Sequence, residues 1–444
     1  MINRIRNTIK IYQIIGDFTE VFLFPRLTNK NNARLLHLVR TERIHFKSIR
    51  NQGLKNLASR KFSSFDTVEA LENSGFPYET HNVVTEDGYI LTLHRILGSN
   101  GYDKLTGIAE ENRIPVFLQH GLWSSSGDWV VSGTSHSLAF LLSKNGYDVW
   151  LGNARGNLYS RRHKWLCPIK DSKDFWNFSW HEMGYMDLPA MIDFVLKVTE
   201  KKQLFYVGHS LGTTMCFVLL STKPEYNDKI KAVFALAPVA YLNNLRSEVL
   251  RHLARVSDRL YDVLEMTGYH SFMPKNGLVS VVDGLLSRNT STLMNNAPLI
   301  LSNLSGYASE DVKKNLKEVI IAHIAAGTST KVLAHFAQSL RTEKSFRQFD
   351  FGVEKNIVAY GQKEPPCYQL SNIRIPIVLF YSKEDWLSTM EDVEALADVL
   401  ENSIKGNLIR KKIELNNFNH LDFIWGSVAR QNIFNDILTY MKTF

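Results

Sequence analysis

The stretch that decides the fold is Leu204-Phe205-Tyr206-Val207-Gly208-His209-Ser210-Leu211-Gly212. Its first four residues form a short apolar run typical of a buried strand, and a longer run that predicts a helix begins at Leu211. Between them stands G-x-S-x-G, the pattern of a sharp strand-to-helix turn that lifts a serine hydroxyl to the top of a sheet. Cβ atoms two residues either side of Ser210 would collide with neighbouring backbone, so glycine is required there. The five-residue pattern recurs by chance, and the flanking strand and helix make it informative.

Short apolar runs on both sides of this motif predict the rest of a sheet. They cover residues 115–119, 147–151, 204–207, 232–236, 375–381 and 408–415. Helical patterns fall between them, for example at 135–145, 186–199 and 211–223. Strands that alternate with helices imply a mainly parallel sheet with helices on both faces. Upstream, Asp87-Gly88 separates two β-rich runs, 81–85 and 89–94, and predicts a hairpin.

The alternation of strands and helices divides the chain into four segments. Residues 1–65 are a basic leader of uncertain structure, and residues 66–240 are the first part of an α/β core. From 241 to 368 the pattern becomes mostly helical, as expected for a helical cap or lid inserted into the core. Residues 369–444 return to the sheet pattern and complete the core. The predicted fold class is therefore α/β, of the α/β-hydrolase type.

The formal charge of +8 is concentrated at the N-terminus. Residues 1–61 hold thirteen Lys or Arg against three acidic residues, a net charge of +10, which leaves the remainder slightly acidic. A protein that binds nucleic acid carries its positive charge on the folded body. We therefore expect no nucleic-acid partner.

The cysteines and the hydropathy pattern exclude several other classes. Cys167, Cys216 and Cys367 cannot form a disulfide framework, and no C-x-x-C pair indicates a zinc or redox site. We expect no metal and no organic cofactor. No apolar stretch reaches the ~20 residues of a transmembrane helix. Asp17 and Glu20 interrupt the apolar core that a signal peptide would need, so the compartment is undetermined.

A serine hydroxyl becomes a strong nucleophile only when a base removes its proton. In this architecture the chain order is Ser, acid, His, and the histidine follows the last strand. His420, in Asn419-His420-Leu421-Asp422, satisfies that order. The acid should follow the preceding strand, where Glu384 and Asp385 are neighbours, and spacing alone does not choose between them.

A tetrahedral intermediate also needs two preorganised N–H donors for its oxyanion. One is the backbone N–H of the residue after the nucleophile, Leu211. The other should lie in the loop after an early strand, where His120-Gly121-Leu122-Trp123 occurs, and Leu122 is the candidate. Taken alone, Gly121 is equally well explained as a turn residue.

Several conspicuous residues are interpreted as structural. Arg155 lies in Asn153-Ala154-Arg155-Gly156-Asn157 and is expected in an ion pair or hydrogen-bond network. Trp176, Trp180 and His181 are expected to pack in the core. Glycosylation is expected at three sequons if the chain is secreted, Asn177-Phe178-Ser179, Asn289-Thr290-Ser291 and Asn303-Leu304-Ser305.

Four motifs together closely resemble the acid lipase family, which includes lysosomal acid lipase, gastric lipase and insect lipase-like proteins. They are Gln119-His120-Gly121-Leu122, Trp150-Leu151-Gly152-Asn153-Ala154-Arg155-Gly156-Asn157, Gly208-His209-Ser210-Leu211-Gly212 and Asn419-His420-Leu421-Asp422-Phe423. The resemblance runs from about residue 65 to the C-terminus. Several independent motifs in the right order make it specific.

The resemblance implies a capped lipase fold that hydrolyses triacylglycerols or steryl esters at a lipid–water interface. It assigns the acid to Asp385 and supports Leu122 and Leu211 as oxyanion donors, and it implies a secreted or lysosomal protein. The chain departs from the family in three places. Leu211 replaces the usual Gln, which preserves the backbone N–H. The cap lacks the family's cysteine pair, and the basic leader replaces the signal peptide.

Two alternatives remain open at this level. A thioesterase or peptidase could use the same Ser210, Asp385 and His420, since a triad does not define its substrate. A lipid carrier that kept the fold and lost catalysis is the other, but it should have lost at least one of these three residues. A dehalogenase or epoxide hydrolase is disfavoured because those enzymes carry aspartate at the nucleophile position.

Overall fold

A computed structural model of the chain describes residues 67–98, 112–272, 305–306, 309, 312 and 326–444. The basic leader predicted at 1–65 and the sequons at Asn289 and Asn303 lie outside the described residues. Of the three sequons, only Asn177 is described, and its side chain accepts a hydrogen bond from Lys331 Nζ at 2.9 Å.

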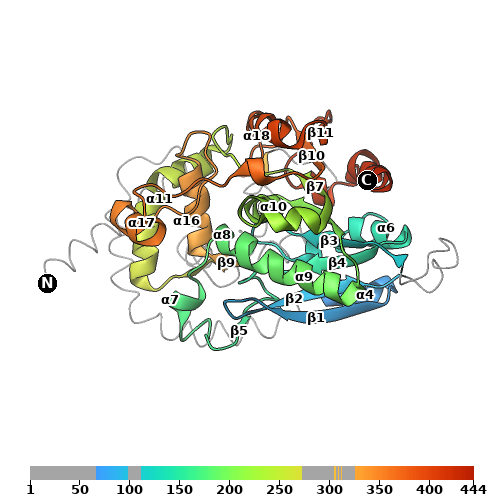
Figure 1. Ribbon diagram of the computed structural model, residues 1–444, viewed down its shortest axis with the longest axis horizontal. Helices are drawn as coiled ribbons and strands as arrows, with labels where there is room; N and C mark the ends of the chain where they lie inside the picture. Colours follow the sequence, from blue (N-terminus) through green and yellow to red (C-terminus); the bar gives the residue numbers. More distant parts are fainter. Residues whose placement is uncertain (1–66, 99–111, 273–304, 307–308, 310–311, 313–325) are drawn as a thin grey trace, which may run out of the picture. The chain divides into compact units, whose positions relative to one another are not determined.

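A nine-stranded sheet dominates the described residues (Figure 1). Its strands in chain order are β1 (Tyr78–Val84), β2 (Tyr89–Ile96), β3 (Pro115–Gln119), β4 (Asp148–Gly152), β5 (Arg162–His163), β6 (Leu204–His209), β7 (Ile230–Leu236), β10 (Ile377–Ser382) and β11 (Leu408–Ile413). The spatial order is β1-β2-β4-β3-β6-β7-β10-β11, with β5 paired to β2. From β4 to β11 every neighbouring pair is parallel, whereas β1, β2 and β5 are antiparallel additions at one edge.

Helices connect the strands and lie on both sides of the sheet. Before β10 the α-helices are α4 (Thr67–Ser74), α6 (Leu138–Lys144), α7 (Ser172–Phe175), α8 (Trp180–Glu182), α9 (Leu188–Thr199), α10 (Leu211–Thr222), α11 (Glu248–Thr267), α16 (Thr330–Ser339) and α17 (Val353–Tyr360). After it come α18 (Met390–Ile404), α19 (Asp422–Trp425) and α20 (Asn435–Thr443). The short η helices are η2 (Ser126–Trp129), η3 (Met183–Asp187), η4 (Pro224–Asp228), η6 (Leu370–Asn372) and η7 (Arg430–Phe434).

Between β7 and β10 the described chain is mainly helical. It contains α11, α16 and α17, together with a two-residue pairing of β8 (Ser271–Phe272) with β9 (Thr328–Ser329). Figure 1 shows these three helices gathered on one side of the large sheet, apart from α6 and α20. Such a segment is what a cap inserted into an α/β core would contain, and the predicted limits of 241 and 368 stay a prediction.

Two hydrophobic cores lie on opposite faces of the sheet because successive strand residues point to opposite sides. On β3, Phe117 belongs to one core, whereas Val116 and Leu118 belong to the other. Strand β10 divides in the same way. Helices α9, α10 and α18 supply apolar residues to the first core, and α6 and α20 supply them to the second. Covering both faces explains why the central strands are apolar runs without alternation.

The observed elements confirm the predicted sheet and hairpin, with shifts at the boundaries. Helix α6 begins at Leu138 rather than 135, and α9 begins at Leu188 because residues 183–187 form a π-helical turn before it. Strand β6 continues two residues beyond the predicted end. His209 still pairs with Leu236 of β7, so the strand ends next to Ser210.

Arg155 follows β4 and is 1% exposed. Its guanidinium contacts the carboxylate of Asp187 at 2.7 Å and that of Asp87 at 2.6 Å. It also lies over the Tyr89 ring, 4.1 Å from the centroid. Burial alone would raise the pKa of Asp87, but the hydrogen bond and charge of Arg155 outweigh it and hold that pKa below its usual value. The predicted ion-pair role of Arg155 is confirmed, and it ties the β1–β2 turn to the residue before α9.

Replacing Arg155 by Met should therefore destabilise the fold strongly. Removal of one partner leaves the Asp187 carboxylate buried without its cation, which costs about 3–5 kcal/mol. Urea unfolding would measure the change in the free energy of unfolding. The control is Arg410→Met, whose side chain forms surface ion pairs and should contribute less than about 1 kcal/mol. Equal effects of the two substitutions would contradict this account of Arg155.

Candidate active site

Ser210 occupies a sharp turn between β6 and α10. Its backbone angles are φ 51° and ψ −118°, a positive-φ conformation outside the allowed regions for a residue with a side chain and therefore strained. The turn is held at both ends. The Ser210 N–H donates to Leu236 O at 3.0 Å, and the Thr213 N–H donates to Ser210 O at 2.8 Å.

The two glycines of the motif are required by close backbone approaches. A Cβ on Gly208 would lie 2.9 Å from the carbonyl carbon of Gly212, and a Cβ on Gly212 would lie 2.4 Å from Gln119 O. Both contacts are with backbone, which cannot rotate away as a flexible side chain can. The steric reason that the sequence gives for these glycines agrees with this geometry.

His420 lies in the loop between β11 and α19, with its ring held by Asp385. His420 Nδ1 and Asp385 Oδ2 are 2.8 Å apart, and both side chains are buried. Asp385 Oδ1 accepts hydrogen bonds from the N–H groups of Leu387 and Ser388 at 2.8 and 2.9 Å. Because the Asp385 carboxylate accepts a hydrogen bond from Nδ1, the ring proton is on Nδ1, and Nε2 is free to accept a proton.

The structure brings Asp385 to His420, and it does not bring Glu384 there. Asp385 follows β10 and is fully buried, whereas Glu384 is half-buried, with its backbone N–H donating to Ser382 Oγ. Spacing in the sequence left these neighbours as alternatives, and the family resemblance assigned the role to Asp385.

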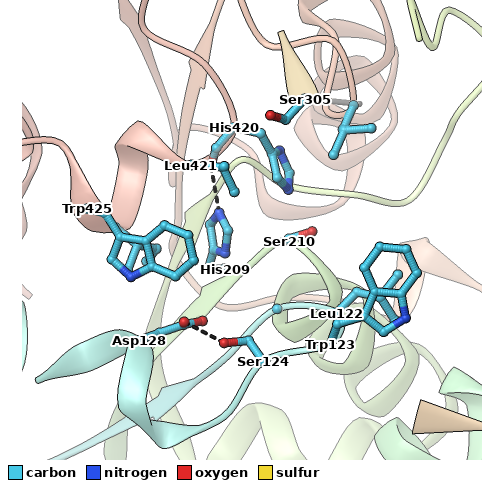
Figure 2. A pocket seen from close by; sticks show the side chains of 13 residues that line it. Leu122, Trp123, Ser124, Asp128, His209, Ser210, Ser305, His420, Leu421 and Trp425 are labelled. Carbon is cyan, nitrogen blue, oxygen red and sulfur yellow. Dashed lines mark hydrogen bonds between the residues drawn. The ribbon is translucent and has the colours of Figure 1, made fainter. Parts of the chain in front are cut away.

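Ser210 and His420 line one cavity (Figure 2). Its walls are mainly apolar and are formed by Gly121, Leu122, Trp123, Ser124, Asp128, His209, Ser210, Ser305, Leu387, His420, Leu421, Ile424 and Trp425. Figure 2 shows the His420 ring and the Ser210 hydroxyl on the same side, with Leu122 and Trp123 below them. An apolar cavity beside a serine and a histidine can hold an uncharged, apolar group next to the serine hydroxyl.

Of the two predicted oxyanion donors, Leu211 directly follows Ser210 in the chain and Leu122 lines the same cavity as Ser210. Leu211 is the first residue of α10, so its N–H has no acceptor within the helix. Leu122 follows Gly121, and a Cβ on Gly121 would lie only 3.3 Å from Ser210 Cβ. The loop backbone therefore runs directly against the serine. The roles of Leu122 and Leu211 as donors stay predictions.

His120 joins this loop to the segment that follows β4. Its Nε2 accepts the Ala154 N–H at 3.1 Å and lies 3.1 Å from Asn157 Nδ2, while its Nδ1 lies 2.8 Å from Gly121 O. A ring that accepts at Nε2 carries its proton on Nδ1 and donates it to Gly121 O. Burial lowers the pKa of His120 to about 4, so this ring is neutral. Two motifs that stand apart in the sequence thus form one hydrogen-bonded unit.

Sequence reasoning missed three residues that line the cavity, His209, Ser124 and Asp128. His209 Nε2 donates to His420 O at 3.0 Å, so the strand that carries Ser210 also holds the histidine loop. Burial lowers the pKa of His209 well below its usual value, which keeps the ring neutral. The Ser124 hydroxyl donates to the Asp128 carboxyl. No signal in one sequence marks them, since each acts through a contact with a distant element or within an irregular loop.

The part of the chain that the structure describes contains no candidate metal centre and no candidate membrane span. No group of three or more His, Cys, Asp or Glu side chains in these ranges could hold a metal ion. None of the helices built from them is long and apolar enough to cross a membrane. The three cysteines, all within the described ranges, are unpaired, and Cys216 is buried in the core.

Comparison with known proteins identifies the class first. The family described as "alpha/beta hydrolase fold" matches residues 114–265, and the one described as "Partial alpha/beta-hydrolase lipase region" matches residues 67–133. With the parallel sheet and the turn at Ser210, these matches define an α/β hydrolase, and the predicted fold is confirmed.

The relatives then identify the family. The chain is 41% identical to Lipase 3 of Drosophila melanogaster over 88% of this chain and 96% of that protein. It is 38% identical to gastric triacylglycerol lipase of Bos taurus, over 87% of this chain and 94% of that one. The human gastric triacylglycerol lipase is 39% identical over 83% of this chain and 88% of its own length. The chain belongs to the acid lipase family, as its motifs indicated, and is a hydrolase of the lipase and esterase class.

The neutral His120 predicts a loss of stability in acid. Its pKa of about 4 lies below the ordinary value of 6.5, so the unfolded chain binds the proton more readily as the pH falls below 6.5. Between pH 7 and pH 5 this histidine alone should lower the free energy of unfolding by about 2 kcal/mol. Urea unfolding at pH 7, 6 and 5 measures the slope.

The variant for this test is His120→Asn, which should reduce the difference between pH 7 and pH 5 by that amount. The exposed His136→Asn controls for the loss of an imidazole at the surface. An unchanged slope in His120→Asn would show that His120 is not held neutral.

Proposed function

We propose that this chain hydrolyses the carboxylic esters of lipids, triacylglycerols or steryl esters, through a Ser-His-Asp triad and an acyl-enzyme. The observation that carries the proposal is the buried His420–Asp385 hydrogen bond of 2.8 Å at a cavity that Ser210 also lines. The apolar walls of that cavity suit an acyl chain. Relatives at about 40% identity named as triacylglycerol lipases support the substrate class.

In the first step, Ser210 Oγ attacks the ester carbonyl as His420 Nε2 takes its proton. The Asp385 carboxylate holds the imidazole by Nδ1 and stabilises the imidazolium that forms. The oxyanion accepts hydrogen bonds from the N–H groups of Leu122 and Leu211. The carbonyl reforms, the C–O bond to the alcohol breaks, and His420 gives its proton to the leaving oxygen.

In the second step, a water molecule gives a proton to His420 and attacks the acyl carbon. The same two N–H groups bind the second oxyanion, and Ser210 leaves with the proton from His420. The chain's own residues and one water molecule balance the reaction. We propose that the enzyme acts at a lipid–water interface, from which a long acyl chain reaches Ser210.

Replacing Ser210 by Ala should remove the nucleophile and lower kcat on emulsified triolein and on cholesteryl oleate at least about 10⁴-fold. The fold should persist, since alanine removes only the hydroxyl. Wild-type protein should form a covalent adduct with a fluorophosphonate at Ser210. Ser403→Ala, a serine at the end of α18, is the control.

Turnover by Ser210→Ala would reject the triad. Wild-type protein active only on thioesters or aminoacyl substrates would keep the triad and reject the lipid ester. Failure of the wild type to react with the fluorophosphonate would favour a lipid carrier.

Replacing Asp385 by Asn should lower kcat about 10⁴-fold, because an amide at this position favours the wrong tautomer of His420. The adjacent Glu384→Gln is a matched control, since it neutralises an acid one residue away that does not contact the imidazole. Hydrolysis of p-nitrophenyl butyrate measures both variants. A greater loss in Glu384→Gln than in Asp385→Asn would exchange the two assignments.

A further inference from the structure

Asp128 is an acid that the proposed mechanism does not use. It belongs to η2, is 4% exposed, and lines the same cavity as Ser210. Figure 2 shows its carboxyl facing the Ser124 hydroxyl. A buried carboxyl in an apolar cavity is costly unless hydrogen bonds stabilise it, so its presence there calls for a function.

Two donors from one loop reach the Asp128 carboxyl. The Ser124 hydroxyl donates to Oδ1, and the Gly121 backbone N–H also favours the charged form. Within the described residues, hydrogen bonds from this loop, and no ion pair with Lys or Arg, stabilise the carboxyl. Asp128 therefore interacts with both ends of the segment 121–124, with Ser124 through a hydrogen bond and with the Gly121 N–H through its electrostatic effect, and the candidate oxyanion donor Leu122 lies between them.

This segment needs support because its backbone is strained and tightly packed. Trp123 adopts φ 61°, and a Cβ on Gly121 would lie 3.0 Å from His209 Nδ1 and 3.3 Å from Ser210 Cβ. Other contacts also hold this segment. His120 Nδ1 donates to Gly121 O, and the Ala326 N–H donates to Trp123 O at 3.0 Å. Asp128 adds a contact from η2, through the Ser124 hydroxyl.

We propose that Asp128 is a positioning residue that, through Ser124 and Gly121, holds the Leu122 N–H against the developing oxyanion. The inference rests on the proposed ester hydrolysis and extends it to a residue outside the triad. A fixed negative charge here would oppose the oxyanion. Burial raises the pKa of Asp128 to about 7, so the carboxyl is readily protonated near neutral pH. Its role is to accept hydrogen bonds.

The test compares substitutions that keep or remove the acceptor. Asp128→Asn keeps an acceptor oxygen, and kcat on p-nitrophenyl butyrate should stay within about threefold of wild type. Asp128→Leu keeps the size and removes the acceptor, and kcat should fall about 10²-fold, as when one oxyanion donor is lost, with KM within about twofold. Affinity for a boronic acid that mimics the tetrahedral intermediate should fall in parallel with kcat/KM.

Ser124→Ala gives a second and milder perturbation if Asp128→Leu fails to fold. It should lower kcat about tenfold, and in the Asp128→Leu background it should cause no further loss, because the two residues act through one contact. Thermal unfolding and fluorophosphonate labelling of Ser210 show that each variant retains its fold and its nucleophile.

Three results would overturn the proposal. Full activity in both Asp128→Leu and Ser124→Ala would show that the Asp128 carboxyl lines the cavity without affecting catalysis. Asp128→Asn as inactive as Asp128→Leu would assign Asp128 a proton-transfer role instead. A rise in KM without loss of kcat or of boronic acid affinity would make it a substrate-binding residue. Wild-type protein that neither hydrolyses esters nor reacts with the fluorophosphonate would reject the proposed function itself, a separate outcome.

Discussion

Ser210 is held at φ 51°, a conformation that costs a residue with a side chain on the order of 1–3 kcal/mol. Packing on both sides of the turn offsets that cost. Strand β6 lies between β3 and β7 in the middle of the sheet, and nearly every residue of α10 is buried. A Cβ on Gly212 would lie 2.4 Å from Gln119 O, so the start of the helix packs directly against the end of β3. The cavity, its loops and the histidine that faces the serine are all arranged around this fixed turn.

Two neutral histidines connect the loops at this end of the sheet. His120 donates to the loop of Gly121 and accepts from the segment after β4, and His209 donates to His420 O. Burial lowers the pKa of both rings, so both stay uncharged; His120 donates one hydrogen bond and accepts another, whereas His209 donates one. Arg155 forms ion pairs with Asp87 and Asp187 and so joins the β1–β2 turn to the residue before α9. Local order at the cavity thus depends on polar contacts set in apolar surroundings.

Much of the fold follows from the sequence because its signals are local. A strand that is buried on both faces must be apolar throughout, and β3, β4, β6, β7 and β10 all show that pattern. Element ends are less well predicted, since tertiary contacts set them. Strand β6 extends to His209 because β7 offers a partner there, and a π-helical turn precedes α9.

The sequence by itself determined the strand-to-helix turn at Ser210, since steric exclusion of Cβ atoms leaves its own mark as glycines at fixed spacing. It also placed His420 and a choice of two acids by chain order. The family resemblance chose Asp385 over Glu384, and only the tertiary structure showed that its carboxyl meets the imidazole and that Asp128 and His209 line the same cavity. The hydrogen bond between His209 and His420 depends on directions and distances of a few ångströms between elements 211 residues apart, and no local pattern encodes it.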